Sequence, residues 1–174
     1  MQAIVDTYLA GLSIGDGTRF EQMTLFPVFC EVTSPLHYRV LSEALADGSV
    51  EVREKAAASV PELWLCNRSE TMVLVMGGEE VVGGKQNRMV NASFLIAPKC
   101  EVALPVTCVE QRRWAKQTDR FSAGEAVYHS LRRETHKQVR EGLRASGRPV
   151  ADQGAVWEAI SDTSNNVWRH VAWR

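Results

Sequence analysis

Several features are missing from this 174-residue sequence, and each absence excludes a class of protein. No stretch is long and apolar enough to span a bilayer. The N-terminal segment lacks a basic region, and Asp6 and Thr7 interrupt its apolar run, so it does not resemble a secretory signal peptide. We therefore expect a cytoplasmic protein with no membrane partner.

Metal-binding and disulfide patterns are also missing. The four cysteines, at positions 30, 66, 100 and 108, include no C-x-x-C pair and have no histidine pattern beside them. This argues against a zinc site and against a disulfide framework, and we expect neither a metal nor a cofactor. A strong net charge is absent too: the formal charge is −1, so nothing indicates a nucleic-acid partner.

The charge is nevertheless uneven along the chain. Residues 1–111 contain 8 Lys+Arg and 14 Asp+Glu, whereas residues 112–174 contain 12 and 7. Most of this excess falls in one predicted helix, on the basic residues Arg132, Arg133, Lys137, Arg140 and Arg144. A solvated helix face is the simpler interpretation, and an anion-binding face is the alternative.

What is present indicates an α+β protein, and we treat residues 1–174 as a single domain. Helical spacing predicts a helix over Gln2–Leu12, and "FEQMTLFPVFC" reads as a strand in which Pro27 marks an edge or a bulge. "SEALADG" reads as a short helix capped by Ser42 and ended by Gly48. Further strands are predicted at Val50–Glu54, Leu63–Cys66, Met72–Met76, Glu79–Val82, Arg88–Ile96 and Glu101–Val109.

Two helices are predicted after these strands, over about 130–146 and from about Asp152. The expected architecture is therefore an antiparallel β-sandwich or barrel-like body, about residues 18–114, followed by a helical segment, about residues 122–165.

The stretch "GGEEVVGGKQNRMVNASF", Gly77–Phe94, concentrates glycines and polar residues, but it is not a phosphate-binding P-loop. Counting back from Lys85, the first required glycine falls at Glu79, and Gln86 stands where serine or threonine is needed. A strand pattern follows, so no helix N-terminus would meet a phosphate. The glycines more plausibly permit positive φ or a close approach of the backbone.

Polar residues fall at the open end of the hairpin predicted from Arg88–Ile96 and Cys100–Glu110. If both apolar faces meet one core, the register sets Glu110 opposite Gln86 or Arg88. One hypothesis is an inward Arg88–Glu110 ion pair that closes the core, and spacing alone favours it. The other is a pocket in which Glu110 acts as acid or base while Lys85 or Arg88 holds an anion.

Four more residues bear on that choice. Cys108 lies on the same face, either as a nucleophile or as a packed core thiol. Glu79 and Glu80 point to opposite faces of a short strand, so at most one of them faces the cluster. Trp114 could stack on a base or close a core edge.

A family resemblance enters at these residues. "GGEEVVGGKQNRMVNASFLIAP" and "EVALPVTCVEQRRW" resemble the signature of the ARPP-1 family, roughly D-G-E-E-L-V-G-A-K-Q-N-R, a strand, then I-P-V-S-C-V-E-Q-G-R-W. The segments "SLRR" and "DQGAVWE" also look similar, and the resemblance covers roughly residues 10–160. The chain departs from the pattern at Gly77, where the family tends to have aspartate, and in its last segment, "SDTSNNVWRHVAWR", which suggests a shortened member.

The resemblance implies a role in the metabolism of NAD-derived nucleotides, because the family is associated by gene neighbourhood with ADP-ribosylglycohydrolases. The implied partner is an ADP-ribose-like nucleotide. The chain would be an enzyme that acts on it or a module that binds it. Alternatively, it is a structural or interaction protein in which the polar residues only lock the core. The implied catalytic residues are Glu110, Cys108 and Glu80, and the implied ligand-binding residues are Lys85, Gln86, Asn87, Arg88, Gln111 and Trp114. Exposure of Trp168 and Trp173 would favour a homo-oligomer.

Overall fold

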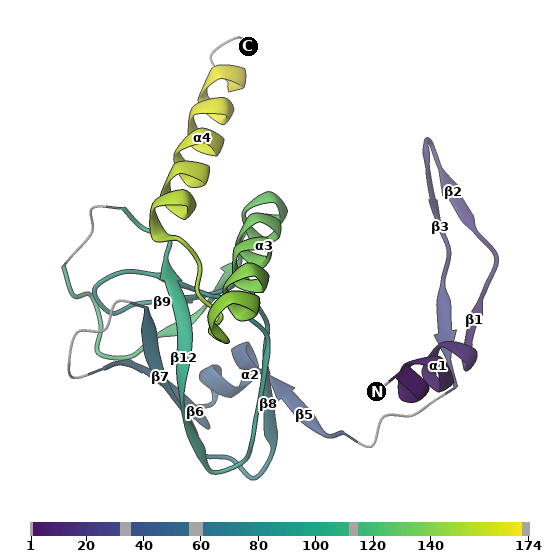
Figure 1. Ribbon diagram of the computed structural model, residues 1–174, viewed down its shortest axis with the longest axis horizontal. Coiled ribbons are helices and arrows are strands. Elements are labelled where there is room, and N and C mark those ends of the chain that lie inside the picture. Colours follow the sequence, from purple (N-terminus) through teal and green to yellow (C-terminus); the bar gives the residue numbers. More distant parts are fainter. Residues whose placement is uncertain (1, 32–35, 56–60, 112–114, 172–174) are drawn as a thin grey trace. The chain divides into compact units, whose positions relative to one another are not determined.

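The computed structural model describes residues 2–31, 36–55, 61–111 and 115–171, and the chain divides into two compact units, Met1–His37 and Tyr38–Arg174 (Figure 1). We call the first the N-terminal unit and the second the body, and each is described by itself. In the described residues the order of strands and helices confirms an α+β fold in which the β-rich part precedes the two long helices.

The N-terminal unit consists of a short helix and two small β-ribbons. Its elements are α1 (Gln2–Ala10), β1 (Leu12–Ile14), β2 (Thr18–Phe20), β3 (Met23–Leu25) and β4 (Val28–Cys30). Strands β1 and β4 pair antiparallel, as do β2 and β3. The single strand predicted for "FEQMTLFPVFC" is therefore wrong: two strands flank Pro27, which has no N–H for a ladder and whose carbonyl accepts a hydrogen bond from the Gly15 N–H at 2.9 Å. The helix predicted to Leu12 ends at Ala10.

The body begins with a strand and a short helix, followed by the strands of two sheets and two long helices. Its first elements are β5 (Tyr38–Val40), α2 (Leu41–Ala46), β6 (Val50–Glu54), β7 (Glu62–Asn67), β8 (Met72–Val75) and β9 (Glu79–Val82). The remaining ones are β10 (Arg88–Val90), β11 (Phe94–Ile96), β12 (Cys100–Cys108), β13 (Ser122–Ala126), α3 (His129–Ser146) and α4 (Gln153–Val171).

The larger sheet is a curled half-barrel of six antiparallel strands in the order β13-β9-β10-β12-β7-β6. Its longest strand, β12, pairs with β7 over Cys100–Pro105 and with β10 over Val106–Cys108. The smaller sheet has the order β11-β8-β5, and its β5–β8 pair is parallel. The two sheets and α2 enclose the main core, which contains alternating inward residues such as Leu63, Leu65, Val73 and Val75.

The strand predicted over Arg88–Ile96 is wrong as one element, because the chain changes sheets within it. Strand β10 pairs with β9 and β12 in the larger sheet, whereas β11 pairs with β8 in the smaller one. Residues 91–93 make the crossing. The Asn91 side chain holds this turn by accepting a hydrogen bond from the Thr107 hydroxyl at 2.7 Å and donating one to the Pro149 carbonyl at 3.1 Å.

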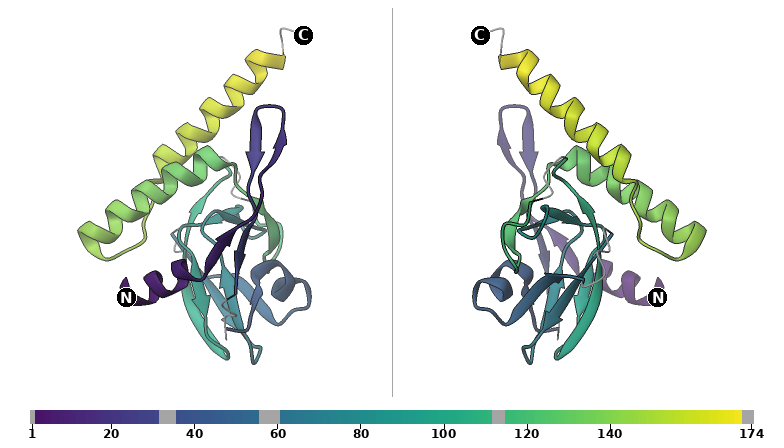
Figure 2. Two further views of the ribbon diagram at one scale, coloured as in Figure 1. Left: turned by 90° about the vertical axis from the view of Figure 1, so that its right-hand side faces the viewer. Right: turned by 90° about the vertical axis from the view of Figure 1, so that its left-hand side faces the viewer.

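The two long helices lie on one side of the body, and α4 reaches beyond the sheet (Figures 1 and 2). A second core cluster of Met89, Leu131 and Val156 joins both helices to β10. Gly147 ends α3 in the left-handed conformation, with φ 69°. The predicted cap at Ser42 is wrong: α2 begins at Leu41, so Ser42 lies inside its first turn, whereas Gly48 follows the helix with φ 75°.

Candidate functional site

A buried polar cluster occupies the beginning of β10. We define the Arg88 cluster as Glu54, Gln86, Arg88 and Cys108. Arg88 is only 2% exposed and stands directly opposite Cys108 in the ladder. Its Nη1 donates to Gln86 Oε1 at 2.9 Å and to Cys108 Sγ at 2.7 Å, and its Nη2 lies 3.8 Å from Glu54 Oε1. Its Nε is buried without a hydrogen-bond partner among the described residues.

The inward position of Arg88 agrees with the sequence, but its predicted ion-pair partner is wrong. Glu54, at the end of β6, supplies the carboxylate rather than Glu110. Strand β6 lies at the far edge of the six-stranded sheet from β13, and the curl of the half-barrel brings its end to β10. Sequence reasoning missed Glu54 because its approach depends on this curl and on no local pattern.

Glu110 lies opposite Gln86, as one of the two predicted registers requires. The Gln86 side-chain amide donates to the Glu110 carbonyl at 2.8 Å, and the Glu110 carboxylate accepts the Asn87 backbone N–H, also at 2.8 Å. The carboxylate therefore fixes the turn that leads into β10.

Of the two neighbouring glutamates in β9, Glu80 is the one close to Glu110. Burial raises the pKa of the Glu80 carboxyl, the Asn87 side chain lowers it by hydrogen bonding, and the charges of Glu110 and Glu125 raise it again. Glu79 instead accepts the Met76 backbone N–H at 2.9 Å, and burial raises its pKa as well. Glu80 and Glu110 thus form a pair of neighbouring carboxyl groups beside Asn87.

Cys108 is fully buried, which disfavours a thiolate. Burial raises the pKa of its thiol, Arg88 lowers it, and the charge of Glu54 raises it. The backbone of Cys108 is held from the other side by Gln153, whose Oε1 accepts the Cys108 N–H at 2.8 Å and whose Nε2 donates to the Cys108 carbonyl at 2.7 Å. Gln153 joins the first turn of α4 to the end of β12 and was also missed, although it stands in the segment "DQGAVWE".

Two further predicted ligand residues, Lys85 and Gln111, are not brought into the Arg88 cluster as side chains. Lys85 is exposed, and only its backbone N–H reaches the cluster, at 3.2 Å from Glu54 Oε1. Gln111 is exposed, and Trp114 lies outside the described residues. The catalytic and ligand-binding roles of these residues stay predictions.

The glycines of the polar stretch allow α3 to approach the turn between β8 and β9. A Cβ on Gly77 would lie 2.8 Å from His136 Nε2, and a Cβ on Gly78 would lie 2.5 Å from Arg132 Cδ. Gly78 also has φ 92°, a conformation that side-chain-bearing residues rarely adopt. The close approach predicted from the glycines is thus observed, and the element that approaches is a basic helix.

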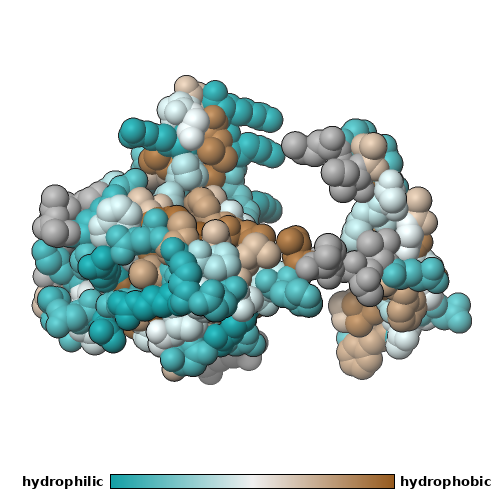
Figure 3. Space-filling view, turned by 90° about the horizontal axis from the view of Figure 1, so that it is seen from below, coloured by the Kyte–Doolittle hydropathy of each residue, from teal (hydrophilic) through white to brown (hydrophobic). Residues whose placement is uncertain are grey.

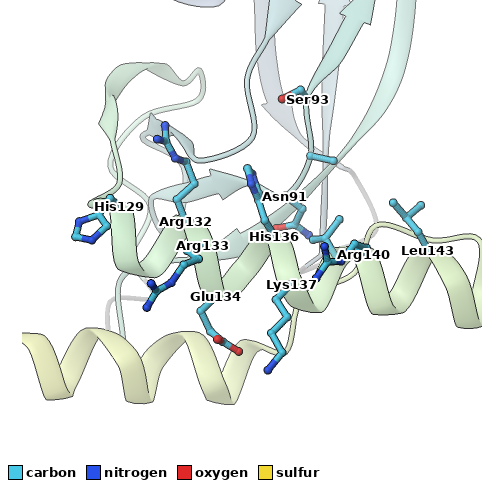
Figure 4. A pocket seen from close by; sticks show the side chains of 12 residues that line it. Asn91, Ser93, His129, Arg132, Arg133, Glu134, His136, Lys137, Arg140 and Leu143 are labelled. Atoms are coloured by element: carbon cyan, nitrogen blue, oxygen red, sulfur yellow. The ribbon is translucent and has the colours of Figure 1, made fainter. Parts of the chain in front are cut away.

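A groove opens between that helix and the turn after β10. Its volume is about 760 Å³, and we call it the α3 groove. Most of its lining comes from α3, and residues 91–93 supply the rest; in Figure 4, Arg132 extends away from α4, whereas Glu134 and Lys137 extend toward it. The lining residues from α3 are His129, Arg132, Arg133, Glu134, His136, Lys137, Val139, Arg140 and Leu143. Among the described lining residues, Glu134 is the only acidic one, against Arg132, Arg133, Lys137 and Arg140, so the groove is positive.

The groove and the Arg88 cluster lie at opposite ends of β10. Gln86 and Arg88 mark the beginning of the strand, and Asn91 follows its last residue, Val90. The structure therefore does not bring the groove's cations to Glu110. Within the described residues, no group of three or more His, Cys, Asp or Glu side chains is arranged to hold a metal ion.

A comparison of the sequence with models of protein families identifies the family of the chain. The model of the ARG and Rhodanese-Phosphatase-superfamily-associated Protein domain, ARPP-1, matches residues 11–171. The chain belongs to the ARPP-1 family. Searches of curated proteins and of solved structures found no match.

The ARPP-1 match contains both the Arg88 cluster and the α3 groove. It also extends through residues 161–171, part of the last segment, which by its sequence departs from the family pattern. At Gly77, where the ARPP-1 pattern tends to have aspartate, a side chain would face His136 in the groove. Neither α3 nor α4, nor a shorter described helix, combines the length and apolarity that a bilayer crossing needs.

Proposed function

We propose that this ARPP-1 protein binds a phosphate-bearing nucleotide of the ADP-ribose type in the α3 groove. One observation carries the proposal: among the described residues, the cations of the groove lack carboxylate partners, whereas most of those in the sheets and their loops have them. Arg132, Arg133, Lys137 and Arg140 form no ion pair with any carboxylate in the described part of the chain.

The sheets and their connecting loops show the opposite pattern. Of the nine described lysines and arginines between residues 38 and 126, eight lie within 4.0 Å of a carboxylate oxygen, and Lys85 is the exception. Uncompensated cations gathered along one groove repel each other, and an anionic ligand removes that repulsion while gaining charge-assisted hydrogen bonds. A phosphate group supplies such an anion.

The size and the polar wall of the groove favour a nucleotide over a single phosphate. Ligand sites commonly have volumes of about 300–1,000 Å³, and the groove, at about 760 Å³, falls in that range. On the wall opposite α3, the Ser93 hydroxyl accepts the Gly77 N–H at 3.0 Å. Its own proton has no acceptor among the described residues and is available to a ribose or base oxygen. ADP-ribose is the first ligand to test, because the resemblance to the ARPP-1 signature implies a nucleotide of this kind.

Isothermal calorimetry with ADP-ribose, NAD, ADP and adenosine tests the proposal. We expect the three phosphate-bearing ligands to bind and adenosine to be much weaker. Arg140→Gln should weaken binding by roughly 5- to 30-fold, the loss of one charge-assisted contact. Arg144→Gln is the matched control, because Arg144 lies on the same helix but does not line the groove. No binding across the panel, or an equal loss in both variants, would refute the proposed site.

A second candidate function is hydrolysis of such a nucleotide, and the Glu80–Glu110 pair favours it. Two neighbouring carboxyl groups, one with a raised pKa, can serve as proton donor and base. Turnover of ADP-ribose derivatives by the wild type, Glu80→Gln and Glu110→Gln tests this role. Undiminished turnover in both variants would exclude the pair from the chemistry, and binding without turnover would support a non-catalytic binding module.

A further inference from the structure

The α3 groove has more positive charge than the two phosphates of ADP-ribose would neutralise. Figure 3 shows a body that is mostly hydrophilic on the face in view, so charged side chains by themselves do not mark a site. Among the described lining residues of the groove, however, four cations stand against a single carboxylate, a net charge of +3 before any protonation of its two histidines. That carboxylate, on Glu134, accepts a hydrogen bond from Gln138 at 3.3 Å and extends toward α4 (Figure 4). The groove therefore suits a ligand with more negative charge than a pyrophosphate alone.

The cations are also spread over a longer distance than one pyrophosphate occupies. Arg133 and Arg140 are seven residues apart on α3, so their Cα atoms are separated by about 10 Å along the helix axis. The two phosphates of a pyrophosphate share a bridging oxygen and lie side by side, so they match the cations of a single helical turn. In Figure 4, Arg132 and Arg133 lie toward the beginning of the helix and Arg140 lies further along it. The groove therefore offers two anion-binding positions, one at Arg132 and Arg133 and one at Arg140.

The two positions differ in how firmly their cations are held. Arg132 is half-buried, and its aliphatic stem packs so closely on the β8–β9 turn that a Cβ on Gly78 would lie 2.5 Å from Arg132 Cδ. Arg140 is exposed. Arg132 and Arg133 also lie near the N-terminus of α3, where the helix dipole favours an anion. This first position combines two arginines, one of them restricted by packing, and suits the most concentrated negative charge of a ligand.

We propose that the groove takes a nucleotide with a phosphate monoester in addition to its pyrophosphate, the monoester at Arg132 and Arg133 and the pyrophosphate at Arg140. This inference rests on the proposed function and defines its ligand class more closely. A phosphate monoester carries a charge of about −1.5 to −2 on one phosphorus at pH 7, and arginine binds such a group through two parallel N–H···O bonds. When the monoester is on the ribose next to the pyrophosphate, one sugar separates the two groups, as positions on different turns of α3 require. Arginine also accommodates the 2′-phosphate in other dinucleotide sites.

NAD and NADP test the proposal, because they differ only in a 2′-phosphate on the adenosine ribose. Isothermal calorimetry with the full-length chain should show that NADP binds roughly 10-fold more tightly than NAD, the gain from one further charge-assisted contact. ADP-ribose and its 2′-phosphate should show the same ratio, which excludes a contribution from the nicotinamide. The ratio should fall as the salt concentration rises, because salt screens exposed charges.

Single substitutions locate the two phosphate groups. Arg132→Gln and Arg133→Gln should each bring the ratio of NADP affinity to NAD affinity toward one, with little loss of NAD affinity. Arg140→Gln should weaken NAD and NADP by the same factor and leave the ratio unchanged. Arg144→Gln is the matched control, because Arg144 does not line the groove. Arg133 is exposed, so its substitution tests the proposal even if Arg132→Gln disturbs the packing on Gly78, and circular dichroism monitors the fold of each variant.

The outcomes distinguish this inference from the proposed function on which it rests. Equal affinities of the wild type for NAD and NADP would overturn the inference and leave the proposed function standing. A preference for NADP that persists in both Arg132→Gln and Arg133→Gln, or that only Arg140→Gln removes, would also overturn it, because the monoester would then lie elsewhere. If none of the four nucleotides binds, the proposed function itself fails and the inference fails with it.

Discussion

The buried Arg88 allows a sharp test of which carboxylate compensates its charge. Glu54→Gln keeps the shape of the side chain and an oxygen acceptor for the Lys85 N–H, but it removes the negative charge that lies 3.8 Å from Arg88 Nη2. If Glu54 compensates the guanidinium, this substitution should be costly in the wild type and nearly harmless once the guanidinium is gone. Arg88→Met removes the guanidinium.

The size of the effect follows from the geometry. Two unit charges 3.8 Å apart interact by about 4 kcal/mol at an effective dielectric constant of 20, and by about 1 kcal/mol in bulk water. Arg88 is 2% exposed and Glu54 22% exposed, so the pair lies between these limits. We expect Glu54→Gln to lower the free energy of unfolding by about 2–3 kcal/mol, less than the loss when one partner of a fully buried pair is removed.

A double-mutant cycle by urea unfolding at neutral pH measures this coupling. In the Arg88→Met background, Glu54→Gln should cost less than about 0.5 kcal/mol, with unchanged denaturant dependence. Glu110→Gln serves as the control, because glutamine can still accept the Asn87 N–H and no coupling to Arg88 is expected. Equal costs of Glu54→Gln in both backgrounds, or a coupling of Arg88 to Glu110 instead, would refute the assignment.

Four other predictions concern single positions. Gly78→Ala should lower the free energy of unfolding by about 2–3 kcal/mol, because the new Cβ would have positive φ and would clash with α3. Gly48→Ala should cost only about 1 kcal/mol, because Gly48 also has positive φ but a Cβ there would have no atom within 4 Å. Thermal unfolding compares the two variants. Gln153→Ala should cost about 2–3 kcal/mol in urea unfolding, because two backbone groups lose their partner. Glu80→Gln should raise the free energy of unfolding at neutral pH. The folded state raises the pKa of the Glu80 carboxyl, so the wild type loses stability as the pH rises through the carboxyl range, and glutamine avoids this loss. The difference between variant and wild type should vanish at acid pH, where Glu80 is protonated in both states. Cys108 should resist alkylation in the folded protein and react only in denaturant, as mass spectrometry of the labelled peptides would show.

Local patterns were sufficient to predict most strands of the body and both long helices. β6 and β9 have the predicted bounds, and α3 begins one residue earlier than predicted. Parity along two strands also limited the residue opposite Glu110 to Gln86 or Arg88, and in the structure it is Gln86. These features depend on residues close in sequence or within one hairpin, and the periodicity of apolar residues can predict such local features.

The errors arise where distant segments decide the structure. The apolar run from Arg88 to Ile96 contains nothing that marks a change of sheet, because each half of it is a good strand. The pairing of Arg88 with Glu54 depends on how far the half-barrel curls. Likewise, the basic stripe on α3 is visible in the sequence, but the wall that turns it into a groove comes from residues 91–93.

The polar stretch that defines the family resemblance therefore has two structural tasks that separate along its length. Gly77 and Gly78 let α3 pack closely against the β8–β9 turn, which positions the cations of the groove. The side chains of Gln86 and Arg88 interact with each other, with the Glu110 carbonyl and with the Glu54 carboxylate. A ligand would have to displace those contacts to reach Arg88, whereas the cations of α3 have no such partners in the described chain. In the proposed function, the buried polar residues Gln86 and Arg88 therefore belong to the scaffold, and the charges offered to the ligand are those on the helix that the scaffold holds in place.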